Sequence, residues 1–91
     1  MNQQEFEIAL QTEGYAPAVR IEQPVGYAMG EHQHPFDAFA FIIAGEIAIE
    51  VSGVTKAYPA GSIFRLAAHT PHLENTIQHG VTYLAGRRTV V

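Results

Sequence analysis

Two histidines separated by one residue stand directly before a long apolar run in this 91-residue chain. His32 and His34 belong to the stretch GEHQHPFDAFAFIIAGEI. On an extended strand, residues i and i+2 point to the same side, with Cα atoms about 6.5–7 Å apart. Two imidazoles placed in this way can both reach one metal ion at about 2.0–2.1 Å. The pair therefore indicates a metal site, and polar histidines beside a loop are the alternative.

Two ligands hold a metal ion weakly, so a third must come from another part of the chain. His72, in the stretch HTPHLENT, is the best candidate because it follows a turn and opens a predicted strand. Glu74 lies two residues later and therefore shares the face of His72. We consider Glu74 a candidate fourth ligand, because an inward carboxylate needs a partner. A hydrogen-bonded or exposed glutamate is the alternative.

Three further polar residues have simpler interpretations. Asp37 has the wrong parity to join His34, and PFD is typical of a turn in which Asp37 caps backbone N–H groups. His69 falls in the turn before His72, and we expect its side chain to be exposed. The alternative is that His69 carries protons at the mouth of a β-barrel, the fold predicted below, since the ordinary pKa of histidine is near 6.5. His79 is expected to face solvent from a loop.

Aromatic and basic side chains supply the remaining candidates. Tyr27 and Tyr83 are expected in the core, where their hydroxyl groups need partners and one of them is available to line a pocket. Arg65, Arg87 and Arg88 are expected on the surface. They would be able to hold a substrate carboxylate only if their side chains faced the cavity of the protein.

The elements that must position these residues are one helix and several short strands. Phe6, Ala9 and Leu10 recur at helical spacing and predict a helix over residues 3–13, with Gly14 as its stop. From Tyr15 onward, apolar runs and turn signals predict strands. They cover residues 18–22, 26–29, 38–44, 46–51, 54–58, 62–66, 71–76 and 81–85, with breaks at Gly45, Ser52-Gly53 and Pro59-Ala60-Gly61. This pattern is typical of an antiparallel sandwich or barrel.

The apolar run after the histidines has two apolar faces. Ala38, Ala40 and Ile42 share the parity of the histidines, whereas Phe39 and Phe41 face the other way. One face fills the barrel, and the other must be covered by the N-terminal helix or by a second subunit. We therefore predict a homodimer.

The spacing of these residues resembles the first sequence motif of the cupin family. That motif is a glycine, five residues, HxH, three or four residues, a glutamate, six residues and a glycine. Its positions here are Gly26, His32, His34 and Gly45, with Ala38 at the glutamate position.

The second cupin motif is a glycine, five residues, a proline, any residue, a glycine, two residues, a histidine, three residues and an asparagine. It begins at Gly61 and reaches His72 with the expected spacing. Ala67 and His69 occupy its proline and glycine positions, and Asn75 comes one residue early.

The resemblance covers about residues 15–86. It implies an all-β fold, a double-stranded β-helix (jelly-roll) barrel with a short N-terminal α-helix, divided into a helical segment 1–14 and a cupin barrel 15–91. It also implies a divalent ion (zinc, iron, nickel or manganese) on His32, His34 and His72. Without the glutamate, three neutral imidazoles leave this ion its full charge and open positions. Such a site favours an anionic, oxygen-rich chelating ligand.

Composition argues against several other classes. The net charge of −4 and the scattered basic residues disfavour nucleic-acid binding. No apolar run approaches the roughly 20 residues needed to span a membrane. The N-terminal stretch is too acidic and polar for a signal peptide, and cysteine is absent, so we expect a cytoplasmic protein without thiol chemistry.

Three functions are compatible with these observations. The first is a metal-binding small cupin that acts on a small chelating metabolite as an isomerase, decarboxylase or dioxygenase, with Glu74 and His69 as candidate catalytic groups. The second is a non-catalytic binding or sensing module for a small ligand. The third is a stable barrel whose metal site has decayed. The three retained histidines favour the first two.

Overall fold

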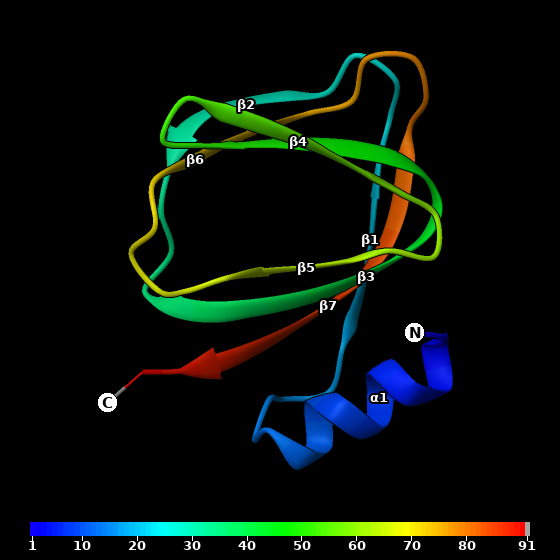
Figure 1. Ribbon diagram of the computed structural model, residues 1–91, viewed down its shortest axis with the longest axis vertical. Helices are drawn as coiled ribbons and strands as arrows, with labels where there is room; N and C mark the ends of the chain where they lie inside the picture. Colours follow the sequence, from blue (N-terminus) through cyan, green and yellow to red (C-terminus); the bar gives the residue numbers. More distant parts are fainter. Residues whose placement is uncertain (91) are drawn as a thin grey trace.

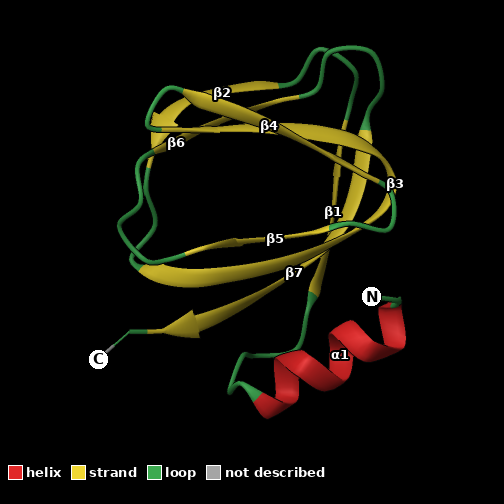
Figure 2. Ribbon diagram, in the orientation of Figure 1, coloured by secondary structure: helices red, strands yellow, loops and turns green. Residues whose placement is uncertain are grey.

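The computed structural model describes residues 1–90 as one helix and seven antiparallel strands that curl into a barrel (Figures 1 and 2). The elements are α1 (Gln3–Thr12), β1 (Val19–Gln23), β2 (Ala28–His32), β3 (Phe36–Val51), β4 (Val54–Pro59), β5 (Ile63–Leu66), β6 (His72–Asn75) and β7 (Val81–Thr89). This arrangement confirms the predicted all-β barrel with a short N-terminal helix. No helix among these residues is long and apolar enough to cross a membrane.

Strand β3 organises the barrel because it belongs to both of its layers. Its first half pairs with β5 and β7, and its second half pairs with β4 and β6. Strand β1 extends the first layer by pairing with β7, and β2 extends the second by pairing with β6. Figure 1 shows these two layers facing each other across the barrel interior.

The predicted strand break at Gly45 is wrong, because β3 continues through this residue. Gly45 has φ 75°, and the pairing of β3 with β7 shifts register between Ile42 and Ala44. A Cβ atom at Gly45 would collide with the carbonyl oxygen of Gly80. A glycine at this bend lets one strand pass from one layer to the other, where the sequence pattern suggested two separate strands.

The helix begins at a capping box and ends as predicted. The side chain of Asn2 accepts a hydrogen bond from the Glu5 N–H, and the Glu5 carboxylate accepts one from the Asn2 N–H. Gly14 follows the C-cap with φ 80°, a conformation that glycine adopts without strain. The helix buries Phe6 and Leu10 against the barrel.

The core consists of two clusters on opposite faces of the β3 layer. One fills the barrel, and its buried members are Ala40, Ile42, Ile47, Ile49, Phe64, Val81 and Tyr83. The other lies between this layer and α1, and its buried members are Phe6, Leu10, Phe39, Phe41 and Leu84. This division confirms the two predicted faces of the apolar run. Since α1 covers the outer face, that face does not itself require a second subunit, and the homodimer stays a prediction.

Most remaining strand boundaries lie within two residues of their predicted positions, but β7 is longer than predicted. The Ser52-Gly53 turn joins β3 to β4 with φ 53° and φ 78°, as in a type I′ hairpin. Strand β7 extends four residues beyond Ala85 to Thr89 because it continues to pair with the start of β3. The predicted strand ended at Ala85, whereas Arg87 and Arg88 lie within β7.

Candidate metal centre

Three histidines from two parts of the chain meet inside the barrel. His32 ends β2, His34 lies in the connection to β3, and His72 opens β6. His32 and His72 are cross-strand partners, and their ring centroids are 4.2 Å apart. One ring nitrogen from each of the three side chains lies within 4.8 Å of those of the other two. The structure thus brings together the three residues that the sequence singled out.

Backbone carbonyl groups determine which nitrogens of this cluster are free. The Nδ1 atom of His32 is 2.8 Å from the Gly30 carbonyl oxygen, and that of His72 is 2.8 Å from the Thr70 carbonyl oxygen. A carbonyl oxygen only accepts hydrogen bonds, so in the neutral form of each ring Nδ1 carries the proton and Nε2 keeps a lone pair. Hydrogen bonds of this kind orient histidine ligands in metal sites.

The two Nε2 atoms are buried and have no hydrogen-bond partner among residues 1–90. An unpartnered polar atom in the interior costs free energy, so two of them in one cluster indicate a missing partner. A divalent metal ion is such a partner, because it accepts lone pairs from neutral imidazoles. The donor set and its orientation therefore fit a metal ion.

The third imidazole is also held in the form that binds metals. Burial lowers the pKa of His34, and the neighbouring His32 and His72 lower it further. A lower pKa favours the neutral imidazole of His34, the form that metal coordination requires. Its ring stacks on Phe36, with centroids 4.9 Å apart and an interplanar angle of 13°.

Glu74 lies beside the histidines, facing inward as its parity predicts. Its side chain is only 12% exposed, and its Oε2 atom is 3.9 Å from Nε2 of His72. The Tyr27 hydroxyl donates a hydrogen bond of 2.6 Å to the other carboxylate oxygen. Burial raises the pKa of Tyr27, and the hydrogen bond to Glu74 raises it further, so this phenol remains a donor. The sequence did not predict this contact, which joins residues 47 positions apart.

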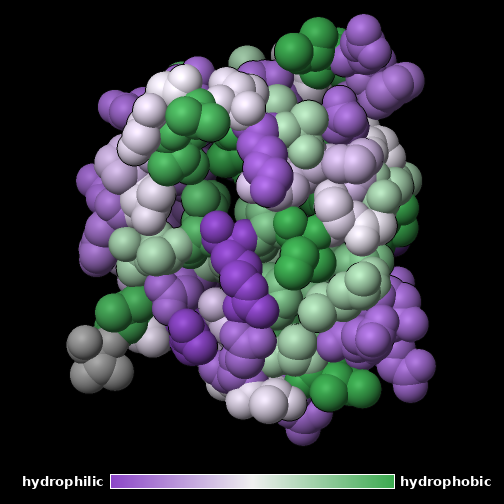
Figure 3. All heavy atoms as spheres, in the orientation of Figure 1, coloured by the Kyte–Doolittle hydropathy of each residue, from purple (hydrophilic) through white to green (hydrophobic). Residues whose placement is uncertain are grey.

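The histidines and Glu74 line a cavity of about 200 Å³ inside the barrel. Tyr83, Ala38 and Arg87 also line it. Burial raises the pKa of Tyr83 to about 12, and the charge of Glu74 contributes to this shift, so its hydroxyl stays neutral. The space-filling view down the barrel shows a hollow between hydrophobic and hydrophilic side chains (Figure 3).

Asp37 lies outside the cluster, in agreement with its parity. Its carboxylate accepts a hydrogen bond of 2.8 Å from the Ala68 N–H and pairs with Arg88 at 2.8 Å. These hydrogen bonds, the one from Arg88 first, lower the pKa of Asp37. The predicted turn with a local cap is wrong, because Phe36 and Asp37 begin β3 and the N–H that Asp37 caps belongs to Ala68, 31 positions along the chain.

The other two histidines lie away from the cluster. His69 is exposed, and its backbone N–H donates a hydrogen bond to the His34 carbonyl oxygen at 2.7 Å. It has φ 63°, a left-handed conformation that explains why the second cupin motif places a glycine here. His79 is exposed in the connection between β6 and β7, as expected.

The three arginines were expected on the surface, and one of them, Arg87, also takes the alternative position at the cavity. Its side chain is exposed and also lines the histidine cavity. Arg65 and Arg88 instead tie the end of α1 to the barrel, through hydrogen bonds to the carboxylate and the carbonyl oxygen of Glu13. The alternation of Tyr83, Ala85 and Arg87 along one strand was the available signal. It was missed because the predicted strand stopped at residue 85.

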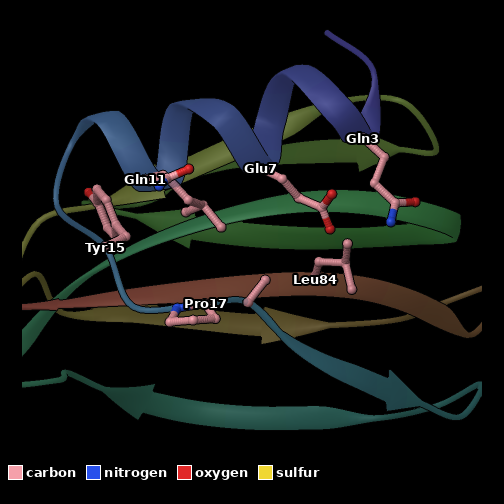
Figure 4. Close-up of a pocket in the computed structure, with 8 residues that line it drawn as sticks. Gln3, Glu7, Gln11, Tyr15, Pro17 and Leu84 are labelled. Carbon is pink, nitrogen blue, oxygen red and sulfur yellow. The ribbon is translucent and has the colours of Figure 1, made fainter.

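A larger cavity of about 490 Å³ lies between α1 and the outer face of the barrel (Figure 4). Gln3, Glu7 and Gln11 of the helix line one side, and Tyr15 and Leu84 lie across from them. Glu7 is the only carboxylate among its lining residues, which include no histidine. The cluster of potential metal ligands therefore lies in the smaller cavity.

Comparison with solved structures shows the same fold in proteins of low sequence identity. A cupin superfamily protein from Desulfitobacterium hafniense superposes with a TM-score of 0.70 at 15% identity, over 78% of this chain and 64% of that one. The DMSP lyase DddQ from Ruegeria pomeroyi gives 0.73 at 25% identity, over 81% and 38%. A predicted oxalate decarboxylase from Thermotoga maritima gives 0.71 at 18% identity, over 90% and 73%.

This chain thus spans less than two thirds of the length of the first two of these proteins. The comparison with curated proteins finds no match. The family model of the Cupin domain matches residues 19–80, which is more than half of the chain. The barrel topology and this match agree, and the chain therefore belongs to the cupin family.

Proposed function

We propose that this protein is a metal-binding small cupin in which His32, His34 and His72 hold a divalent ion, such as zinc, iron, nickel or manganese. One observation carries the proposal. Two buried Nε2 atoms have no partner among residues 1–90, while the Nδ1 atoms of the same rings are committed to carbonyl oxygens. This combination supports a site built for lone-pair donation to a cation.

The chain's own residues prepare this site in three ways. The carbonyl groups of Gly30 and Thr70 hold two imidazoles in the coordinating tautomer. The barrel keeps water away, since His72 is 1% exposed. Tyr27 binds one oxygen of Glu74 and leaves the other directed to the cluster, which supports Glu74 as a fourth ligand or a proton acceptor. A bound divalent ion would supply Lewis-acid activation of an oxygen ligand.

We further propose that the ligand is a small, oxygen-rich metabolite that chelates the metal. The cavity of about 200 Å³ is smaller than the roughly 300–1,000 Å³ of pockets for drug-sized ligands. Two similar structures are named for reactions of small molecules, a DMSP lyase and a predicted oxalate decarboxylase, which supports a ligand of this size. Turnover of that ligand as an isomerase, decarboxylase or dioxygenase is the enzymatic form of the proposal.

Elemental analysis of the untagged protein tests the proposal. We compare the parent with His72→Ala, and we use His79→Ala as the matched control because His79 is exposed in a loop. We expect about one metal ion per chain in the parent and the control, and less than a tenth of that in His72→Ala. Equal metal in all three proteins would overturn the three-histidine site. Absence of metal from the parent after incubation with iron, zinc, manganese and nickel would do so too.

A further inference from the structure

Arg87 differs from every other arginine in residues 1–90 because it has no carboxylate within 4.0 Å. The others are paired: Arg20 with Glu22, Arg65 with Glu13, and Arg88 with Asp37. The one unpaired guanidinium is also the one that lines the histidine cavity. A cation at the wall of a cavity attracts anions, and guanidinium suits planar carboxylates in particular.

The direction of Arg87 follows from the alternation of β7. Tyr83, Ala85 and Arg87 all line the cavity. Leu84 packs on the other side, against α1. The guanidinium carbon of Arg87 is 4.5 Å from the ring centroid of Phe36, whose ring stacks on His34. The cation therefore lies at the histidine end of the cavity.

Arg87 is also the cross-strand partner of Ala38. Directly opposed residues in an antiparallel pair have Cβ atoms about 4.5–5.5 Å apart. Ala38 occupies the glutamate position of the first cupin motif and lines the same cavity. A glutamate there would face Arg87 across the strands. With alanine, neither the three histidines nor Arg87 receives a carboxylate from this position.

We propose that a carboxylate of the ligand occupies the place left free at Ala38, between Arg87 and the metal on the three histidines. The ligand is then a small carboxylic acid with a second chelating oxygen, such as a 2-oxo acid, a 2-hydroxy acid or a short dicarboxylate. This inference rests on the proposed function, since it assigns one end of the ligand to the metal. Arg87 is the residue that selects the carboxylate.

The charges in the cavity agree with an anionic ligand. Glu74 is the one carboxylate that lines the cavity, and Tyr27 already binds one of its oxygens. A divalent ion, Glu74 and Arg87 would together carry a net charge of about +2 beside neutral imidazoles. An anionic ligand offsets this charge beside the buried His72.

Calorimetric titration of the metal-loaded protein with oxalate tests the inference. We compare the parent with Arg87→Gln and use Arg20→Gln as a matched control, because Arg20 is an exposed arginine on β1, outside the cavity. We expect Arg87→Gln to bind oxalate about 10- to 100-fold more weakly, the loss typical of a charged hydrogen bond. Arg20→Gln should match the parent. Arg87→Lys should recover part of the affinity, because it keeps the charge but loses the paired N–H groups.

A second variant tests the place assigned to the carboxylate. Ala38→Glu puts a carboxylate opposite Arg87, so we expect it to keep its metal and lose at least tenfold in oxalate affinity. Metal content is measured before and after each titration, so that removal of metal by oxalate is recognised.

The outcomes separate the two proposals. A parent without metal overturns both the proposed function and this inference. A metal-loaded parent that binds none of oxalate, pyruvate and glycolate overturns only the inference. Equal oxalate affinity of the parent and Arg87→Gln, with equal metal, also overturns only the inference.

Discussion

Replacing Phe6 by alanine tests how the helix contributes to the barrel. Phe6 is completely buried, and its ring centroid is 4.9 Å from that of Phe39 and 5.7 Å from that of Phe41. Both partners belong to β3, and their neighbours Ala38 and Ala40 face the barrel interior. Phe6 thus supports, from outside, the strand that forms one wall of the histidine cavity.

The expected loss of stability follows from this burial. A phenylalanine side chain buries about 150–250 Å², worth about 4–6 kcal/mol at roughly 25 cal/mol per Å². Measured losses for buried Phe→Ala changes are about 3–5 kcal/mol, which we take as the expected range. For a domain of this size, such a loss lowers the Tm by at least about 12 °C. Urea unfolding followed by circular dichroism measures the free energy of unfolding directly.

Ile8→Ala is the matched control, because Ile8 lies on the same helix but is 58% exposed. We expect its unfolding free energy to stay within about 0.5 kcal/mol of the parent value. A loss below about 1 kcal/mol for Phe6→Ala would refute the packing argument. The helix would then be a separable attachment to the barrel, not part of its core.

The remaining predictions concern metal removal, acid stability and the bend of β3. A chelator should lower the Tm at pH 7.5, and the decrease should be smaller near pH 5, where protonated imidazoles no longer bind metal. An unchanged Tm after verified metal removal would contradict the coupling between metal binding and folding. The pKa of Asp37 is lower in the folded protein than in the unfolded chain. The ionised Asp37 therefore stabilises the fold above the unfolded pKa of about 4, and this stabilisation is lost as the pH falls from there through the folded pKa. Urea unfolding of Asp37→Asn between pH 3 and 7 should therefore show a weaker pH dependence than the parent, and identical profiles would count against this assignment. Gly45→Ala should destabilise more than Gly53→Ala in the same assay, because both glycines have positive φ but only a Cβ at Gly45 meets backbone atoms; equal losses would show that the contact with Gly80 has no effect.

Local patterns in the sequence were sufficient for the main elements. The helix follows from the spacing of Phe6 and Leu10 and from Gly14. The two faces of β3 follow from strict alternation, which places Phe39 and Phe41 opposite Ala40 and so separates the two core clusters. These features depend on neighbouring residues, whose relative directions are determined by helix or strand geometry alone.

The histidine cluster was predictable partly from local spacing and partly from the position of a distant residue. His32 and His34 are close because they are two residues apart, which is a local fact. His72 lies 38 positions beyond His34, and its place beside them was inferred from the turn before it, from the strand that it opens and from its position in a family motif. The structure shows the cause, because β6 pairs with β2 and places His72 directly opposite His32.

The sequence by itself therefore determined the helix, most of the strands, the two faces of the apolar run in β3 and the three candidate histidines. Tertiary structure alone decided the polar contacts around them: the bond from Tyr27 to Glu74, the pair of Asp37 and Arg88, and the place of Arg87 opposite Ala38. These contacts join residues about 50 positions apart, and which of them meet depends on strand register. A shift of register by one residue would turn each of these side chains to the other face. The order of residues along the chain does not specify that register until the whole barrel has closed.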